Sequence, residues 1–239
     1  MIHSHNAVRV LHAIGIFLLA LILYWGVRFA HTASISKRLV ERSVPYQNVS
    51  NDHAWTMLVI GDSTAVGVGA TTPEQSLAGR VALRIGATYT ENHAVSGALV
   101  NDLPKQIAEA KLQEYDLILV QIGANDIVRF HDAKATTAEL ARYLDTLPKT
   151  KKLILVSAGD VGAATLIPPP LRPFYTKLNR SYHAEYARAF PDSYVNLGTG
   201  PGSQLFKERP DVYLAADGFH PSSAGYGIWF DAVAPKLSE

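Results

Sequence analysis

Three polar side chains in this sequence are of the types that acyl transfer requires. Ser63 follows an apolar run in the segment MLVIGDST, and Asp217 and His220 stand three residues apart in DGFHPSSAGY. That separation lets one turn of chain bring the carboxylate and the imidazole to the same side. There the carboxylate can fix the histidine tautomer and stabilise the imidazolium. A serine nucleophile, a base and an orienting acid make up a nucleophilic acyl-transfer site.

Two further residues are of types that stabilise the negative charge formed during acyl transfer. Asn125 follows the apolar run YDLILVQIG, and its side-chain amide can donate to an oxyanion. Gly97 can offer only its backbone N–H, which the missing side chain leaves accessible. Taken singly, each of these residues is better explained by a turn or a helix cap, where Gly, Asn, Asp and Ser are common. Pro221 suits the start of a helix and disfavours helical geometry at His220.

Two other kinds of chemistry fit the sequence less well. The stretch GDSTAVGVGA lacks both the third glycine of a dinucleotide fold and the lysine of a phosphate-binding loop. The nine histidines show no paired spacing typical of zinc, and Asp217 and His220 have no evident third partner, so no metal site is expected. The chain has no cysteine, which excludes disulfides, thiolate catalysis and cysteine-ligated metals.

An alternation of strands and helices after residue 54 must position these residues. Strands are expected at 55–61, 88–95, 115–123, 152–159 and 193–198, and helices at 75–86, 102–113, 136–147, 173–190 and 222–237. Five strands separated by helices predict a parallel sheet covered on both faces. In such sheets ligands bind outside the carboxyl ends of the strands, where Ser63, Gly97 and Asn125 are expected.

Four short blocks resemble the SGNH hydrolases, a branch of the GDSL esterase/lipase family named for Ser, Gly, Asn and His. The blocks are GDSTAVG (61–67), NHAVSGA (92–98), GAND (123–126) and DGFHPS (217–222). They occur in the family's order, and the resemblance extends from about residue 55 to 237. Each block is weak alone, but four in order form a specific signal.

The resemblance implies a fold and a set of roles. The expected fold is α/β, a three-layer α/β/α sandwich with a mainly parallel, flavodoxin-like five-stranded sheet, preceded by an N-terminal transmembrane helix. Ser63 would be the nucleophile, His220 the general base and Asp217 its orienting acid. The backbone N–H groups of Ser63 and Gly97 and the amide of Asn125 would form the oxyanion hole, and no cofactor is required.

One residue departs from the family pattern. Thr64 stands where the family name carries leucine, and the sequence assigns it no role. The departure bears on substrate contacts more than on the chemistry. Asp62 and Asp126 belong to the motif blocks, and we expect them to hold the loops by hydrogen bonds.

Residues 10–27, VLHAIGIFLLALILYWGV, form an apolar run that suits a membrane span. At 1.5 Å per residue it covers about 27 Å, close to the thickness of a bilayer core. We expect a membrane anchor or signal sequence over 1–30, a linker over 31–54 and the hydrolase domain over 55–239. A cleaved signal peptide has only weak support because no clean cleavage site follows the run, and a buried core helix would need a polar face.

The charges near this segment raise a conflict about orientation. The first 51 residues carry five basic residues and one acid, although the net charge of the whole chain is only +1. This bias favours a membrane surface over nucleic acid as partner. Most of these charges follow the run, so the positive-inside rule places the main domain in the cytoplasm. A single-pass anchor with an exported or periplasmic domain, which we otherwise expect, disagrees with that rule.

The loop 158–174 leaves the fourth strand at the expected ligand-binding edge and is stiffened by four prolines. We expect Leu166, Ile167 and Leu171 to wall an acyl pocket; the alternative is a rigid loop with no ligand role. The principal functional hypothesis is a membrane-tethered esterase or lipase that hydrolyses small-molecule, lipid or glycan esters. A carbohydrate O-acetylesterase or acetyltransferase is the second hypothesis, and a non-catalytic binding module is the third.

Overall fold

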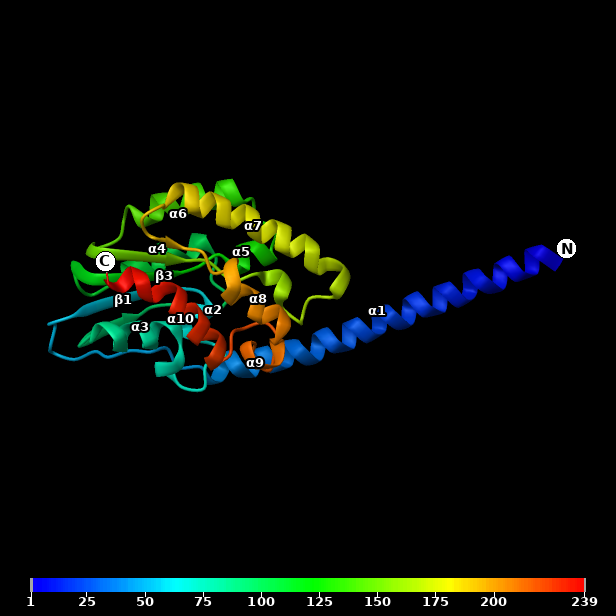
Figure 1. Ribbon diagram of the computed structural model, residues 1–239, viewed down its shortest axis with the longest axis horizontal. Helices are drawn as coiled ribbons and strands as arrows, with labels where there is room; N and C mark the ends of the chain where they lie inside the picture. The colour runs from blue at the N-terminus through cyan, green and yellow to red at the C-terminus, as the bar shows by residue number, and fades with distance from the viewer. Residues whose placement is uncertain (1, 239) are drawn as a thin grey trace.

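The computed structural model describes residues 2–238, and its main domain is a three-layer α/β/α sandwich (Figure 1). The strands are β1 (Thr56–Gly61), β2 (Tyr89–Asn92), β3 (Glu114–Gln121), β4 (Lys149–Val156) and β5 (Tyr194–Val195). They form one sheet in the order β2-β1-β3-β4-β5, and every neighbouring pair is parallel. The expected fold class is therefore confirmed.

Helices cover both faces of this sheet. The α-helices are α1 (Ile2–Arg42), α2 (Ser63–Val66), α3 (Leu77–Ile85), α4 (Leu103–Ala108), α5 (Ala124–Val128), α6 (Ala133–Leu144), α7 (Arg172–Ala189), α8 (Gly200–Glu208), α9 (Pro210–Tyr213) and α10 (Ser223–Ser238). Short 3₁₀ turns are η1 (Pro73–Gln75), η2 (Val100–Asp102), η3 (Val161–Ala163) and η4 (Pro169–Leu171).

Two apolar clusters fill the space between the layers. Alternate strand residues point to opposite faces, so Leu58 and Ile60 of β1 pack with α4, α6 and α7, whereas Met57 and Val59 pack with α3 and α10. Both faces of the central strands are thus buried, which explains why their sequences are almost continuously apolar. The two clusters hold the sheet rigidly between the helical layers.

The expected elements are present, with differences at their ends. β2 ends at Asn92, three residues earlier than expected, and β5 contains only Tyr194 and Val195. α4 ends at Ala108, five residues earlier than expected. The helices α2, α5, α8 and α9 were not predicted. Three of them, α2, α5 and α9, have only four or five residues, too few to show a helical period.

The N-terminal segment is one continuous helix of 41 residues. It continues through Arg42, so the first part of the expected linker is helical; residues 31–42 contain no glycine or proline to end the helix. α1 is long and apolar enough to cross a membrane, and a signal sequence would have the same features. No part of its apolar window is buried in the described chain, which is contrary to a core helix.

Candidate active site

The nucleophile candidate sits where β1 turns into α2. Asp62 caps α2: its carboxylate accepts hydrogen bonds from the backbone N–H of Thr64 at 2.9 Å and from the Thr64 hydroxyl at 2.8 Å. Ser63 is the first residue of α2, so its own N–H has no acceptor inside the helix. The turn therefore presents both the hydroxyl and a free backbone donor of Ser63 at the carboxyl edge of the sheet.

The structure brings His220 and Asp217 to this serine. Nε2 of His220 lies 3.0 Å from Oγ of Ser63, and Nδ1 lies 2.6 Å from Oδ2 of Asp217. The other carboxylate oxygen of Asp217 accepts from the backbone N–H groups of Phe219 and His220. The ring of Phe219 stands edge-on to the imidazole at 5.2 Å. Ser63, His220 and Asp217 are all buried, so the surrounding packing constrains their geometry.

Gly97 reaches the same edge because the chain continues alongside β1 after β2 has ended. The backbone N–H groups of His93 and Val95 donate to the carbonyls of Val59 and Gly61. Gly97 has a left-handed backbone with φ 85°, and a Cβ placed there would meet no other atom within 4 Å. Its requirement for glycine is therefore a matter of backbone conformation.

Asn125 stands at the start of α5, directly after β3. Its Nδ2 donates to the carbonyl oxygen of Ala98 at 2.9 Å, which ties the amide to the Gly97 turn and leaves the second N–H of the amide available. Asp126 accepts from the backbone N–H of Val100 at 3.2 Å. Asp126 and Asp62 thus hold the loops, as expected.

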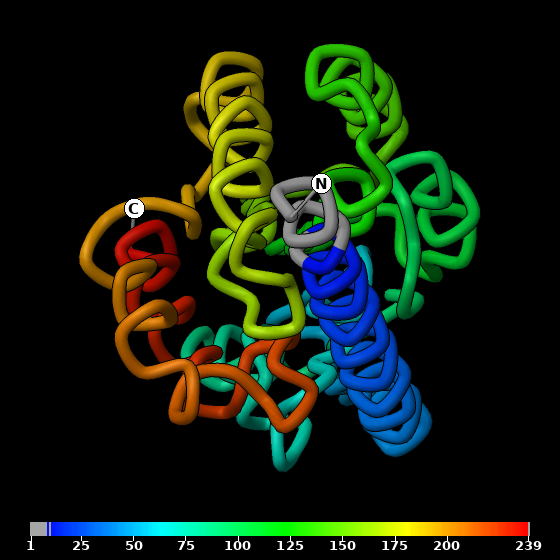
Figure 2. The backbone as a smooth tube through the Cα atoms, turned by 90° about the vertical axis from the view of Figure 1, so that its right-hand side faces the viewer, coloured from blue at the N-terminus to red at the C-terminus, as the bar shows by residue number. Residues whose placement is uncertain are grey.

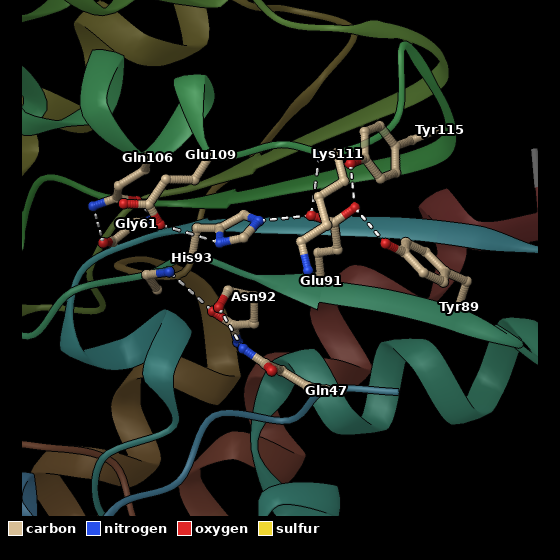
Figure 3. A network of polar contacts seen from close by, with 11 residues as sticks. Gln47, Gly61, Tyr89, Glu91, Asn92, His93, Gln106, Glu109, Lys111 and Tyr115 are labelled. Carbon is tan, nitrogen blue, oxygen red and sulfur yellow. Dashed lines mark hydrogen bonds and ion pairs between the residues drawn. The ribbon is translucent and has the colours of Figure 1, made fainter. Parts of the chain in front are cut away.

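Sequence analysis missed several residues that support the nucleophile turn. The side-chain amide of Gln106 makes two hydrogen bonds to the backbone of Gly61, accepting at 2.7 Å and donating at 2.9 Å (Figure 3). Asn92 donates to the carbonyl of Ala65 in α2 at 2.9 Å. A polar residue on a helix face carries no sequence signal of this kind, so only the packed structure reveals the role of Gln106.

A buried carboxylate anchors the strand that leads to Gly97. Glu91 accepts hydrogen bonds from the hydroxyls of Tyr115 at 2.6 Å and Tyr89 at 2.9 Å (Figure 3). Its other oxygen lies 2.7 Å from Nε2 of His93, whose Nδ1 faces Glu109 of the segment after α4 at 3.3 Å. Burial opposes the charge on Glu91, but these hydrogen bonds hold its pKa below the ordinary value. The network joins β2, β3 and the end of α4.

The two acids beside the serine–histidine pair differ in their electrostatics. Burial alone would raise the pKa of Asp217, but hydrogen bonds and the charge of His220 hold that pKa below its ordinary value. Burial raises the pKa of Asp62 to about 6, against the opposing effect of the Thr64 hydrogen bonds. Asp217 is consequently ionised at neutral pH and suited to orient His220.

A small apolar cavity of about 50 Å³ lies beside His220. Its lining residues come from the segment 158–164, from the ends of α2 and α5 and from α8 to α10, and include Ala158, Gly159, Ala163, Ala164, Phe219 and Trp229. The indole Nε1 of Trp229 is buried and has no hydrogen-bond partner in the described chain. The cavity is therefore lined mainly by apolar residues, and one lining residue, Trp229, carries an unpaired donor.

The three residues expected to wall an acyl pocket do not line this cavity. Ile167 is buried in the core, Leu171 is 49% exposed, and Leu166 lines a different cavity between α1 and the Asp217 loop. The loop does supply the walls, but through its small residues before Thr165. Apolar character predicted burial for these side chains, not the direction in which each would point.

The described residues contain no group of three His, Asp or Glu side chains arranged to hold a metal ion.

The profile of the GDSL-like lipase/acylhydrolase family matches residues 59–228, and the chain belongs to this family. This confirms the family expected from the four motif blocks.

Comparison with individual proteins agrees with this assignment. A GDSL-like esterase of Mycobacterium tuberculosis is 27% identical in an alignment of 196 residues that covers 77% of this chain and 62% of the relative. This chain thus matches less than two thirds of that protein's length.

Solved structures show the same fold. A catalytic mutant of an acetylxylan esterase from Geobacillus stearothermophilus superposes with a TM-score of 0.54 at 22% identity, covering 77% of this chain and 94% of the other. Phospholipase A1 from Streptomyces albidoflavus NA297 superposes with a TM-score of 0.56 at 17% identity, covering 77% and 99%.

Proposed function

We propose that this chain is a serine hydrolase that cleaves carboxylic ester or thioester bonds by two-step acyl transfer through Ser63. The observation that carries the proposal is the unbroken line from Ser63 Oγ through the His220 ring to the Asp217 carboxylate, with separations of 3.0 and 2.6 Å. Family membership supports the same reaction class.

In the first step the hydroxyl of Ser63 attacks the ester carbonyl while Nε2 of His220 takes its proton. Asp217 stabilises the imidazolium that forms. The backbone N–H groups of Ser63 and Gly97 and the amide of Asn125 donate to the oxyanion. The alcohol or thiol leaves with the proton from His220, and water activated by the same ring then releases the acid.

The cavity beside His220 favours short acyl groups. A volume of about 50 Å³ accommodates a few heavy atoms, not a long alkyl chain. This observation supports the second candidate function, an O-acetylesterase acting on glycans, alongside a general short-chain esterase. Rates for p-nitrophenyl esters from C2 to C16 separate these two functions from a lipase: we expect the highest kcat/KM at C2 to C4, and a maximum at long chains would contradict a short acyl site.

Labelling of the folded full chain with a fluorophosphonate tests the reaction class itself. We expect one adduct, on Ser63, that disappears in the Ser63→Ala variant. Ser96 lies close to the Gly97 turn on the same edge of the sheet, so Ser96→Ala is a matched control that should keep the adduct. A non-catalytic binding module would give no adduct on Ser63 in the folded protein.

We further propose that α1 remains as a single-pass anchor and that the catalytic domain is exported. The length and apolar character of α1 support the anchor, whereas the basic residues after its apolar run argue for a cytoplasmic domain. Retention in the membrane pellet after carbonate washing tests the anchor. Protease accessibility of the domain in spheroplasts tests the side of the membrane.

A further inference from the structure

An exposed aromatic cluster is formed by the segment after α5 and the first turn of α7. Phe130 and Phe174 are 58% and 52% exposed, and their ring centroids are 5.7 Å apart. Tyr175, which is half-buried against the core, contacts both rings at 5.6 and 5.8 Å. Leu171, three residues before Phe174, is also exposed. We call Phe130, Leu171 and Phe174 the aromatic patch.

The backbone holds Phe130 in this exposed position. Among the described non-glycine residues, Phe130 alone has a positive φ, 61°. This conformation is unfavourable for a residue with a bulky side chain. Strained backbone of this kind persists where the surrounding structure enforces it, often at binding sites. The turn directs a large apolar ring to the surface beside Phe174, although phenylalanine rings are usually buried.

The segment that carries Leu171 and Phe174 lies on the side of the domain from which α1 projects. In Figure 1 the N-terminal part of α1 extends beyond the side where the strands have their carboxyl ends, and the start of α7 is the part of the domain that reaches furthest that way. Figure 2, viewed from this side, shows the loop before α7 beside the projecting helix. A hydrogen bond from Arg28 to the carbonyl of Thr165, at 3.2 Å, ties α1 to that loop.

The two segments that carry the patch are rich in basic residues, which suits a lipid headgroup region. Segments 129–134 and 171–180 contain five basic residues and a single acid, although the chain as a whole is nearly neutral; the basic residues are Arg129, Lys134, Arg172, Lys177 and Arg180. Tyr24 and Trp25 stand near the end of the apolar run of α1, where aromatic residues prefer the membrane interface. Aromatic rings flanked by basic residues bind anionic membrane surfaces in the same way.

We propose that the aromatic patch enters the interface of the bilayer that α1 spans, so that the catalytic edge of the domain is held against the membrane surface. The proposal rests on the anchor role proposed for α1. With two attachments, the helix and the patch, the domain cannot rotate freely about its tether. The site is then presented to esters at the membrane surface.

The natural absence of cysteine allows a direct test with single introduced thiols. Phe174→Cys and, as a second probe of the patch, Leu171→Cys would carry an environment-sensitive fluorophore in the full chain. The matched control is Lys149→Cys. Lys149 is exposed and is the first residue of β4, so it lies at the amino end of the strand, opposite the carboxyl edge of the sheet. The proteins are reconstituted into vesicles of phosphatidylcholine and phosphatidylglycerol, with or without nitroxide groups on the acyl chains close to the headgroups.

We expect lipid nitroxides to quench the probes at 171 and 174 at least about twofold more strongly than the probe at 149. Equal quenching at all three positions would overturn the proposal. Emission that depends on protein concentration and not on lipid quencher would indicate a second copy of the chain as the occupant, and would also overturn it.

Two controls separate the membrane contact of the patch from the proposed anchor role of α1 and from the proposed serine hydrolase reaction. A probe in the apolar run of α1, Leu19→Cys, must be quenched by nitroxides deep in the bilayer if α1 is an anchor. Fluorophosphonate labelling of Ser63 in the same preparations reports on the reaction class. Intact labelling and a quenched Leu19 probe with no quenching at 171 or 174 would refute the patch alone.

Discussion

Nε2 of His220 lies 3.0 Å from Oγ of Ser63, although 157 residues separate the two in the chain. Removing the hydroxyl leaves the base without a partner, so Ser63→Ala should lower kcat/KM for p-nitrophenyl acetate by roughly 10³-fold or more. The substitution removes one oxygen and should leave the thermal midpoint nearly unchanged. Full activity in a folded Ser63→Ala protein would show that another residue is the nucleophile.

Asp217→Asn should lower kcat by roughly 10²- to 10⁴-fold, because an amide no longer enforces the productive histidine tautomer. Since the pKa of Asp217 lies below its ordinary value, the carboxylate of the unaltered protein stays ionised across the neutral and mildly acidic range. Because the asparagine amide does not ionise, raising the pH should not restore the variant. The control is Asp211→Asn, which should retain full activity. Asp211 is an exposed acid on α9 that pairs with Arg209.

Asn125→Ala should reduce kcat by about 10²- to 10³-fold with little change in KM, because in the proposed mechanism the amide acts mainly on the charge of the transition state. The same amide holds Ala98, so thermal melting should be measured alongside kinetics. Asn101→Ala removes an exposed amide that bonds Tyr143 and serves as the control. A loss confined to stability, with kcat preserved, would argue against an oxyanion role.

Gly97→Ala should cost about 1 kcal/mol in the free energy of unfolding and also lower kcat, because alanine resists a positive φ. Gly86 offers a matched control: it too has a positive φ, 66°, and a Cβ placed there would meet no other atom within 4 Å, but it ends α3. We expect a similar loss of stability in Gly86→Ala without loss of kcat. Equal kinetic effects in both variants would mean that Gly97 acts through stability only.

The buried carboxyl of Asp62 should make stability depend on pH. Its pKa, about 6 in the folded protein against 3.8 ordinarily, means that the folded state retains the proton more strongly. The protonated carboxyl of Asp62 therefore stabilises the folded state fully below about pH 4. This stabilisation is lost as the pH rises through about 6, which lowers the free energy of unfolding by an amount on the order of 2–3 kcal/mol.

Asp62→Asn should remove this part of the pH dependence, which urea unfolding from pH 4 to 8 measures. Thr64→Val deletes a hydroxyl that lowers the pKa of Asp62, so the loss of stability should extend to higher pH, whereas Thr64→Ser keeps the hydroxyl and should resemble the unaltered protein. An unchanged profile in Asp62→Asn would assign the pH dependence to another group.

Most of the architecture was predictable because burial leaves a direct mark on sequence. The apolar runs of β1, β3 and β4 and the periodic helices between them were recognised, and the parallel orientation of the strands followed from the alternation. The short helices α2 and α5, which carry Ser63 and Asn125, were missed because they are too short to show a period. The continuation of α1 through Arg42 was missed because a mixed-polarity helix outside the core resembles a linker.

The sequence by itself determined the residue types of the site and their order along the chain, since each motif is local and acyl transfer requires those types. Tertiary structure alone decided which groups meet: His220 with Ser63, Gln106 with Gly61, and Thr64 with the carboxyl of Asp62. It also decided that residues between 158 and 164 of the loop, together with Phe219 and Trp229, line the cavity beside His220, whereas Leu166, Ile167 and Leu171 do not. The physical reason is that hydrophobicity and local propensity specify burial and element type, whereas the direction of each side chain depends on how distant segments pack.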